Sequence, residues 1–263
     1  MVLFTFVAGV TVLELPTGLP PKADRDGASL RIAAANLAFF NTESEAAGRR
    51  VAELGADVLV LLEWTGANAR GHQDLDSWNV ILDEPRRGAH GVRILARTTL
   101  EAEAVLVPTP IVGPCPMPIA TARVRFGRGW LAILGVHAPP PIDACEETNA
   151  PTLLALADIV NKGRLLQDIG VAREGDPVVM AGDFNALPGS RELAPLRYVG
   201  LVDTHMRQHW RPIGTWTPSK SVPHLLRIDY VFAPEDISVV GSWTVNLPGS
   251  DHRAVVAELA PLD

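Results

Sequence analysis

The sequence predicts an α/β fold in which two packed β-sheets are flanked by helices. Short apolar runs recur along the chain and are typical of buried strands. Segments with helix-like spacing of apolar residues are fewer and lie between those runs. A chain with many strands and a few interspersed helices is expected to pack its sheets face to face, with the helices outside them.

Length and composition favour one large folded domain preceded by a short segment. The chain has 263 residues, of which 47% are hydrophobic and 20% are charged, so it can build a sizeable core and is not a disordered chain. Residues 1–15 are strongly apolar, with Glu14 as their one charge, and residues 16–27 have the composition of a linker. We therefore expect an N-terminal segment over residues 1–28 and the folded domain over residues 29–263.

The apolar start has two interpretations. It lacks the basic residues and the small-residue cleavage site of a signal peptide. It is also shorter than the roughly 20 residues that span a bilayer. It is either the end of a membrane segment whose beginning lies outside this sequence or an element packed on the domain.

In the first half of the domain, strands are expected to alternate with a helix. Residues 30–36 form a short apolar run with a polar end, and residues 56–62 are almost continuously apolar, as in a strand buried on both faces. Between them, residues 43–54 place alanine, valine and leucine at helical spacing. Further apolar runs predict strands over residues 78–82, 91–96 and 104–107.

The second half contains a hairpin, two helices and three late strands. Residues 120–126 and 130–137 are expected to form the hairpin around a Gly-Arg-Gly turn. After a run of prolines, residues 150–169 are expected to form a helix with a kink near Gly163, and residues 193–198 form a shorter one. The remaining strands are predicted over residues 177–181, 228–232 and 254–259.

Charge and cysteine content limit the class of protein. The formal net charge is −7, whereas a protein that tracks nucleic acid usually carries a basic face. An acidic total still permits a local basic patch. Cys115 and Cys145 do not have metal-ligand spacing. They are either buried small hydrophobic residues or, in an exported protein, a disulfide.

Polar side chains gather at the ends of the predicted strands. Loops at such positions commonly present binding and catalytic groups on a rigid scaffold. The candidate residues are Asn36, Glu63, His137, Asp183, Asn185, Asp229, Asp251 and His252.

These residue types fit the hydrolysis of a phosphate ester. A hard cation such as Mg²⁺ takes oxygen ligands, typically one or two carboxylates with water and a substrate phosphate. Glu63, Asp251 and the amide oxygen of Asn36 supply such ligands. Asp229 and His252 are candidates for a carboxylate–histidine pair that acts as acid or base, or stabilises charge, near neutral pH. No G-x-S-x-G or Cys/His nucleophile pattern occurs.

Each residue taken alone also has a structural interpretation. Asp183 and Asn185 could form an Asx-turn, because both residue types favour turns. Asp251 could cap the last element, and His137 could be structural. Asp229 is different, because a carboxylate within an apolar strand needs a partner.

Six motifs, in this order, resemble those of the endonuclease/exonuclease/phosphatase superfamily. They are Asn36, Leu61-Leu62-Glu63, Val136-His137, Gly182-Asp183-Phe184-Asn185, Arg227-Ile228-Asp229-Tyr230 and Ser250-Asp251-His252. The resemblance spans about residues 30–260, and Gly-Asp-Phe-Asn and Ser-Asp-His are its most specific parts. It implies a four-layer α/β sandwich of two mixed β-sheets flanked by helices, with the site at one mouth of the sheets. It also implies a phosphatase, phosphodiesterase or nuclease that depends on Mg²⁺ or Mn²⁺.

The resemblance implies which residues hold the metal. Glu63 is the main ligand, and Asn36 and Asp251 complete or support the metal shell. Many members have Gln before the metal-binding Glu, where this chain has Leu62, and Ser before an Arg of the middle strand, where it has Ala96. Neither difference touches the metal shell, so hydrolysis is still expected, while substrate choice can differ.

The catalytic roles also follow from the resemblance. Asp183 positions the attacking water or assists the leaving group. Asn185 and His137 hold phosphate oxygens. His252, oriented by Asp229, acts as acid or base or stabilises the transition state.

The substrate is less defined, because one fold and one set of core motifs serve many phosphate esters. The apolar start, residues 137–141 (HAPPP) and residues 214–218 (GTWTP) resemble bacterial membrane-anchored members associated with glycopeptide resistance. This favours a monomer outside the cytoplasm, near a membrane through its N-terminal segment. It favours a small or lipid-linked phosphorylated substrate over nucleic acid. Trp64, beside Glu63, could line the substrate mouth or belong to the core.

Two other functions would each require a different feature of the chain. A DNA-processing endonuclease or exonuclease of the same superfamily would need a basic face beside the site. A non-catalytic binding module would lack a ligand or a base, and none is missing from the motif set.

Overall fold

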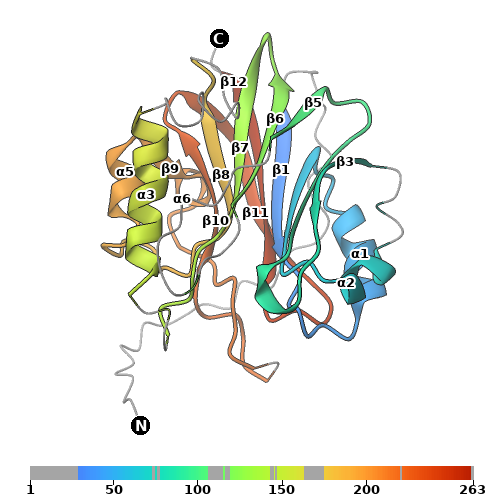
Figure 1. The fold of residues 1–263 in the computed structure, drawn as a ribbon. Coiled ribbons are helices and arrows are strands. Elements are labelled where there is room, and N and C mark those ends of the chain that lie inside the picture. The colour runs from blue at the N-terminus through green and yellow to red at the C-terminus, as the bar shows by residue number, and fades with distance from the viewer. Residues whose placement is uncertain are drawn as a thin grey trace.

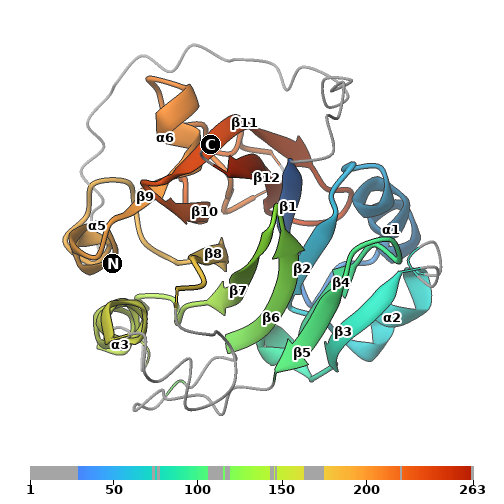
Figure 2. The same cartoon turned by 90° about the horizontal axis from the view of Figure 1, so that it is seen from above.

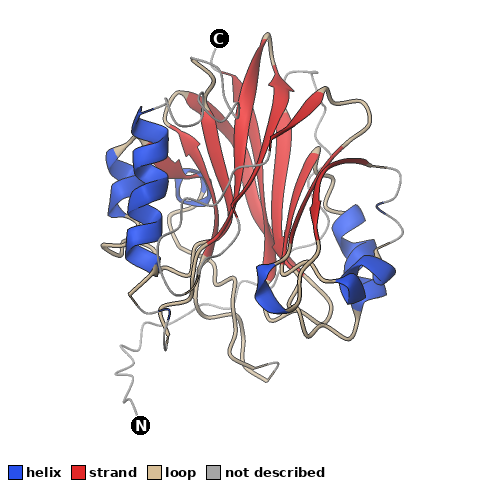
Figure 3. Ribbon diagram, in the orientation of Figure 1, coloured by secondary structure: helices blue, strands red, loops and turns tan. Residues whose placement is uncertain are grey.

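Two six-stranded β-sheets face each other at the centre of the molecule, and helices cover their outer faces (Figures 1 and 2). The computed structural model describes residues 29–72, 75, 78–105, 115, 119–142, 145, 147–162, 175–219 and 221–261. Figure 3 shows the strands in the middle of the molecule and the helices at its sides. The four-layer α/β sandwich is thus confirmed. The expected N-terminal segment, residues 1–28, lies outside the described residues.

The first sheet has the strand order β11-β12-β1-β2-β4-β3. Its strands are β1 (Leu30–Asn36), β2 (Val58–Leu62), β3 (Asn79–Glu84), β4 (Val92–Ala96), β11 (Ile237–Asn246) and β12 (Arg253–Pro261). β1 and β2 run parallel and the other pairs are antiparallel, so the sheet is mixed. On this side lie the helices α1 (Ser44–Ala52) and α2 (Gly66–Gly71) and the short turn η2 (Gly88–His90).

The second sheet has the strand order β5-β6-β7-β8-β10-β9. Its strands are β5 (Ala102–Val105), β6 (Ile119–Phe126), β7 (Gly129–His137), β8 (Val178–Asp183), β9 (Leu201–Asp203) and β10 (Asp229–Pro234). β7 and β8 run parallel and the other pairs are antiparallel. The helices on this side are α3 (Asn149–Lys162), α5 (Ala194–Tyr198) and α6 (Thr204–Gln208).

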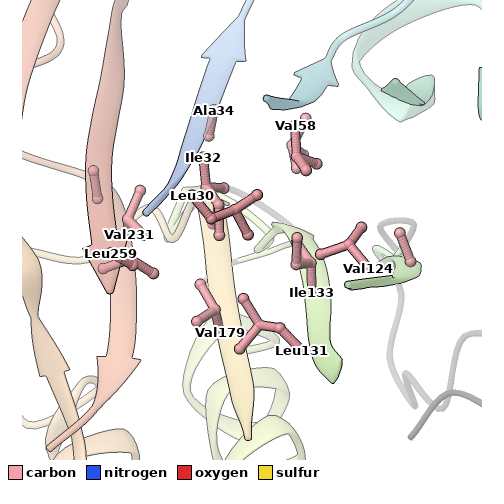
Figure 4. Close-up of a cluster of buried hydrophobic side chains, with 14 of the residues drawn as sticks. Leu30, Ile32, Ala34, Val58, Val124, Leu131, Ile133, Val179, Val231 and Leu259 are labelled. Atoms are coloured by element: carbon pink, nitrogen blue, oxygen red, sulfur yellow. The ribbon is translucent and has the colours of Figure 1, made fainter. Parts of the chain in front are cut away.

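Aliphatic side chains from alternate strand positions fill the space between the sheets (Figure 4). On β1, Ile32 and Ala34 point into this space, whereas Ala33 and Ala35 pack with α1 on the outer face. Because successive side chains of a strand point to opposite faces, Asn36 continues the inward row. The same alternation holds in β7, β8 and β10. Polar residues therefore occupy the last inward positions at one end of the sandwich.

Most of the predicted elements are present, and the structure also contains elements that the sequence pattern did not predict. β9, β11, α2 and α6 were not predicted. The sequence of β11 mixes Ser, Gly and Thr with apolar residues, and many of its side chains are partly exposed. It is a strand because it pairs along its length with β12, which a local pattern does not reveal. The C-terminal parts of the predicted elements 104–107 and 150–169 lie outside the described residues.

Side chains from the end of α6 cover β11, the outer strand of the first sheet. Arg207 Nη1 donates to the carbonyl of Ile237 at 2.9 Å, and His209 Nε2 donates to the carbonyl of Ser242 at 2.8 Å. Edge carbonyls that already accept hydrogen bonds are less available for pairing with another chain. The short helix thus protects an edge of the sandwich.

Cys115 and Cys145 form a disulfide, with Cα atoms 5.4 Å apart. The bond ties the segment before β6 to the segment after β7, and it decides between the two interpretations that the sequence left open. Within the described ranges, no helix combines the length and apolarity needed to span a bilayer.

Candidate active site

The polar strand ends meet at one mouth of the sandwich because of the strand register. In the second sheet, Asp183 at the end of β8 lies opposite His137 on β7 and opposite Asp229 on β10. In the first sheet, Asn36 ends β1 beside the end of β2, so that Glu63 follows directly beyond it. His137, Asp183, Asp229 and Asn36 all continue inward-facing rows. They therefore point into the space between the two sheets.

The amide group of Asn36 links the two sheets. Its Nδ2 donates to Glu63 Oε1 at 3.1 Å and to Asp183 Oδ2 at 3.2 Å, while its Oδ1 accepts from the backbone N–H of Ala38 at 3.1 Å. Asn36, Glu63 and Asp183 are all buried. The side chains of Glu63 and Asp183, which come from different sheets, are thus bridged by the amide nitrogen of Asn36.

Backbone strain is concentrated at this mouth. Glu63 (φ 54°), Ala38 (φ 56°) and Asn185 (φ 49°) are the described non-glycine residues with positive φ. Such a conformation costs on the order of 1–3 kcal/mol per residue and persists where surrounding contacts enforce it. At Glu63 the backbone N–H of Phe39 donates to Oε2 at 2.7 Å. The turn and this hydrogen bond together fix where the carboxylate lies.

His252 and Asp229 form a buried pair. His252 Nδ1 lies 3.0 Å and 3.1 Å from the two carboxylate oxygens of Asp229, and its Nε2 lies 3.8 Å from Asp183 Oδ2. The hydroxyl of Thr215 accepts from the backbone N–H of Asp229 at 3.1 Å, and the hydroxyl of Ser250 accepts from the backbone N–H of His252 at 3.0 Å. Because Asp229 faces Nδ1, the ring presents Nε2 to Asp183.

His137 and Asn185 lie on the other side of Asp183. The Nδ1–H of His137 donates to the carbonyl of Ala89 at 3.0 Å, and its Nε2 lies 3.8 Å from Asp183 Oδ2. The backbone N–H of Asn185 donates to Asp183 Oδ1 at 2.9 Å, which is the Asx-turn considered for this motif. Asn185 Nδ2 donates to the carbonyl of Ala138 at 2.9 Å. An amide nitrogen has a second N–H, which can donate to a phosphate oxygen.

Burial and neighbouring charges shift the protonation of these groups. Burial, followed by the charge of Asp229, raises the pKa of Asp183 to about 8. Burial, followed by the charge of His252, lowers the pKa of His137 to about 4. Burial also opposes a charge on His252, but the carboxylates of Asp229 and Asp183 outweigh it and raise its pKa to about 10. At neutral pH, in the absence of metal, His252 is a cation paired with Asp229 and His137 is neutral.

The carboxylates at the mouth outnumber the cations. Glu63, Asp229 and the half-buried Asp251 supply carboxylates, and Asp183 adds a fourth when it loses its proton, against the single charged ring of His252. Within the described part of the chain, their ion pairs are with histidines, and no lysine or arginine pairs with them. Buried carboxylates without enough positive charge are costly. The donor set therefore fits a hard divalent cation that prefers oxygen ligands.

Two sets of residues can be compared as ligands. The ligand atoms of Asp183, Asp229 and His252 lie within 4.8 Å of one another. Both oxygens of Asp229 already face His252 Nδ1, so this trio is better suited to proton transfer than to coordination. Glu63 keeps lone pairs for a cation, whereas Asn36 turns its amide nitrogen to the carboxylates. The Asn36 oxygen can become a ligand if the amide group turns over.

Asp251 is held by a residue outside the predicted site. Trp216 Nε1 donates to Asp251 Oδ2 at 3.0 Å, and Trp216 forms isolated β-bridges with Leu226 and His252. No hydrogen bond among the described residues joins Asp251 to Glu63. The GTWTP segment that contains Trp216 also contains Thr215, which supports Asp229. The sequence of this segment carries part of the resemblance to membrane-anchored members, but its role in supporting Asp251 and Asp229 was not predicted.

Trp64 does not line the mouth, so that interpretation was wrong. Its side chain is fully buried, its Nε1 donates to Asp83 Oδ1 at 2.8 Å, and the guanidinium of Arg93 lies 4.8 Å from its ring centre. Trp64 therefore belongs to the hydrophobic core on the outer face of the first sheet, and its N–H has a hydrogen-bond partner, as is usual for a buried tryptophan.

The fold and the site together define a phosphohydrolase of α/β-sandwich architecture. Residues 33–252 match the Endonuclease/Exonuclease/phosphatase family. Since this match covers most of the chain, the protein belongs to that family. It is therefore a hydrolase that acts on phosphoesters.

Solved structures share the fold at low sequence identity. A humanized D. rerio TDP2 is 18% identical with a TM-score of 0.63, and the match covers 88% of this chain and 99% of that one. A family protein from Bacteroides thetaiotaomicron is 15% identical with a TM-score of 0.64, covering 89% and 98%. Sphingomyelinase C from Streptomyces griseocarneus is 18% identical with a TM-score of 0.58, covering 88% and 99%. A search of curated proteins gave no match.

Proposed function

We propose that this protein hydrolyses phosphate esters with the help of a divalent cation, Mg²⁺ or Mn²⁺. Glu63 would be its main ligand, with Asn36 and Asp251 completing or supporting the shell. When bound, the cation would neutralise charge on the phosphate and lower the pKa of a bound water. The observation that supports this most is the gathering of three buried acidic side chains, Glu63, Asp183 and Asp229, at a mouth with one cationic imidazole.

The residues of the chain would divide the remaining work. Asp183 orients the attacking water or assists the leaving oxygen, since its Oδ2 lies 3.8 Å from Nε2 of both His137 and His252. The His252–Asp229 pair presents a fixed N–H that stabilises negative charge or moves a proton. From the opposite side of Asp183, Asn185 would hold a phosphate oxygen through its second N–H. His137 would do so through Nε2 once that nitrogen takes up a proton, because its neutral ring already donates from Nδ1 to the carbonyl of Ala89.

We extend the proposal to the substrate class. A small or lipid-linked phosphate ester is favoured over nucleic acid, because the net charge of −7 gives a polyanion no general attraction. The apolar residues 1–15 favour a protein that works near a membrane, and we expect that protein to be a monomer. These expectations guide the choice of substrates below.

The test is hydrolysis of bis-(p-nitrophenyl) phosphate and p-nitrophenyl phosphate with Mg²⁺ or Mn²⁺ and with EDTA. Glu63→Gln and His252→Asn should each abolish metal-dependent hydrolysis while circular dichroism and the melting temperature show a folded protein. His209→Asn, which changes an exposed histidine away from the mouth, should keep full activity. Mg²⁺ should also raise the melting temperature of the wild type but not of Glu63→Gln. Full activity in EDTA, or in both site variants, would reject the proposal.

A nuclease is the second candidate, supported by one comparison. D. rerio TDP2, solved with a single strand DNA product, shares the fold with a TM-score of 0.61 at 18% identity. Parallel assays with single-stranded DNA, plasmid DNA, phospholipids, polyprenyl pyrophosphates and sugar phosphates discriminate the two. Preferential cleavage of DNA would favour the nuclease, and preferential hydrolysis of a lipid or small phosphate would favour the first proposal.

A further inference from the structure

Large apolar side chains are exposed around the mouth of the candidate site. We call them the mouth collar: Phe39, Phe40, Ile142, Leu225 and Leu226. Their exposed fractions run from 39% at Leu226 to 60% at Ile142. The other large hydrophobic residues of the described chain with comparable exposure are spread over other elements. The collar therefore differs from the other exposed hydrophobic residues in that its members lie together near the candidate site.

Hydrogen bonds tie two parts of the collar to the site itself. The backbone N–H of Phe39 donates to Glu63 Oε2 at 2.7 Å, and the rings of Phe39 and Phe40 meet edge to face with centroids 5.2 Å apart. Leu226 pairs with Trp216, which in turn pairs with His252. These parts of the collar are thus held close to Glu63 and His252 by the fold.

The rest of the collar comes from connections that leave the same end of the sandwich. Ile142 follows the end of β7. The connection before β10 carries Leu225, and it emerges at that same end because β10 runs antiparallel to β8. Figure 1 shows these connections below the two sheets, on the side where β7 and β8 end. Loops from both sheets thus carry exposed apolar side chains at the end of the sandwich that holds the candidate site.

We propose that the mouth collar inserts into the surface of a lipid bilayer, so that the site draws phosphate esters from membrane lipids. Apolar groups exposed together and rimmed by polar residues mark contact surfaces, and aromatic rings suit the bilayer interface. A protein partner seated on the collar would close the opening, whereas a membrane both covers the collar and supplies substrate. Since the net charge is −7, attraction to anionic lipids does not explain binding, and burial of the apolar side chains must.

The role of the mouth collar in substrate supply rests on the proposed function, but binding of the collar to a lipid bilayer can be measured without substrate hydrolysis. The full chain is mixed with phosphatidylcholine vesicles containing phosphatidic acid, in EDTA. Hydrogen exchange measured by mass spectrometry should slow in peptides covering residues 37–43 and 221–228 when vesicles are added. Peptides from α3 and α5 should be unchanged.

The decisive variant is the triple change Phe40→Ser, Ile142→Ser and Leu225→Ser, none of which is assigned to the site. Vesicle affinity should fall by about tenfold to a hundredfold, because three partly exposed apolar side chains no longer become buried. The matched control is Leu154→Ser, Tyr198→Ser and Val240→Ser, three large hydrophobic residues on α3, α5 and β11 that are about as exposed as the collar residues or more so. It should bind like the wild type. Both triple variants should hydrolyse the soluble esters like the wild type.

Three results would overturn the inference. They are no vesicle binding by the wild type, protection confined to residues 1–28, and equal affinity of the collar variant and the wild type. Vesicle binding without ester hydrolysis would instead reject the proposed function and would still support membrane binding by the mouth collar. The two failures are therefore distinguishable.

Discussion

At the scale of single residues, one hydrogen bond decides how Asp251 is presented. Trp216 Nε1 donates to Asp251 Oδ2 at 3.0 Å, so one carboxylate oxygen is restrained and the other is left for a cation. Partners of a metal ligand commonly change metal affinity by about 10- to 100-fold when removed. Trp216 is therefore a positioning residue in the proposed mechanism.

We expect Trp216→Phe to weaken the response to metal more than the fold. The half-saturating Mg²⁺ concentration should rise roughly tenfold, while stability falls by about 1 kcal/mol, the usual worth of one hydrogen bond. Trp243→Phe is the matched control, because the Nε1 of Trp243 is buried without a hydrogen-bond partner in the described structure. An equal change in metal response in both variants would argue against the role of the Trp216 hydrogen bond.

The charge of Asp229 sets the protonation of His252. Asp229→Asn keeps the size of the side chain but removes the charge, so the pKa of His252 should fall from about 10 toward or below its ordinary value of 6.5. Hydrolysis should fall by about 10²- to 10⁴-fold. An NMR titration of the His252 ring without metal, and the turnover number, measure the two effects.

The control for this change is Asp203→Asn. Asp203 pairs with Arg227 at 2.9 Å, away from His252. The variant should lose stability without lowering the pKa of His252. A pKa that stays near 10 in Asp229→Asn would show that another group holds the proton.

At the scale of elements, the pairing of β7 and β8 carries the site. Gly182 lies opposite Val136 and has φ +149°, and an added Cβ would lie 1.9 Å from the carbonyl oxygen of Val136. Asp183 is the next residue and takes its place from this pairing. A side chain at position 182 would push the two strands apart.

Gly182→Ala should therefore cost about 3 kcal/mol or more in the free energy of unfolding, through overpacking and backbone strain. Urea unfolding measures the loss. Gly66→Ala is the control, because nothing lies within 4 Å of its added Cβ, and it should change stability by no more than about 0.5 kcal/mol. A Gly182→Ala protein as stable as the control variant would contradict this account of the strand pair.

At the scale of the whole molecule, buried titrating groups have opposite effects on how the stability of the fold depends on pH. Burial lowers the pKa values of His137, His205 and His224 to about 4. The unfolded chain binds these protons at about 6.5, so stability falls as the pH drops from 6.5 to 4. Asp183 keeps a proton up to about 8 that the unfolded chain releases near 3.8, so its contribution falls as the pH rises between those values. The contribution of His252 is present below 6.5 and is lost as the pH rises through about 10.

The metal-free protein should therefore be most stable near pH 6.5 and less stable on both sides. Below this pH, the loss of stability from the three histidines is larger than the gain from Asp183. Above it, the contributions of Asp183 and His252 both fall as the pH rises. Urea midpoints in EDTA between about pH 4 and pH 10 test the shape. His205→Gln should reduce the acid loss and leave the alkaline limb unchanged, since its ring lies away from the mouth against the carbonyl of Arg211. A steady rise in stability toward pH 10 would contradict the prediction.

Local pattern predicted a large part of the site. The two-residue alternation of Ile32, Ala34 and Asn36 already assigns Asn36 to the face of its aliphatic neighbours. The same argument holds for Asp183 and Asp229. The pattern extends over a few residues, so the sequence by itself determines which strand ends are polar and which face they share.

The tertiary structure decided which of those ends meet. Asn36 and Asp183 are 147 positions apart, and their hydrogen bond exists because two sheets close on each other. The same long-range packing buries Trp64, pairs β11 with β12 and places Trp216 on Asp251. Local sequence encodes periodicity, whereas these contacts depend on strand order and chain reversal, so only the assembled sandwich fixes them.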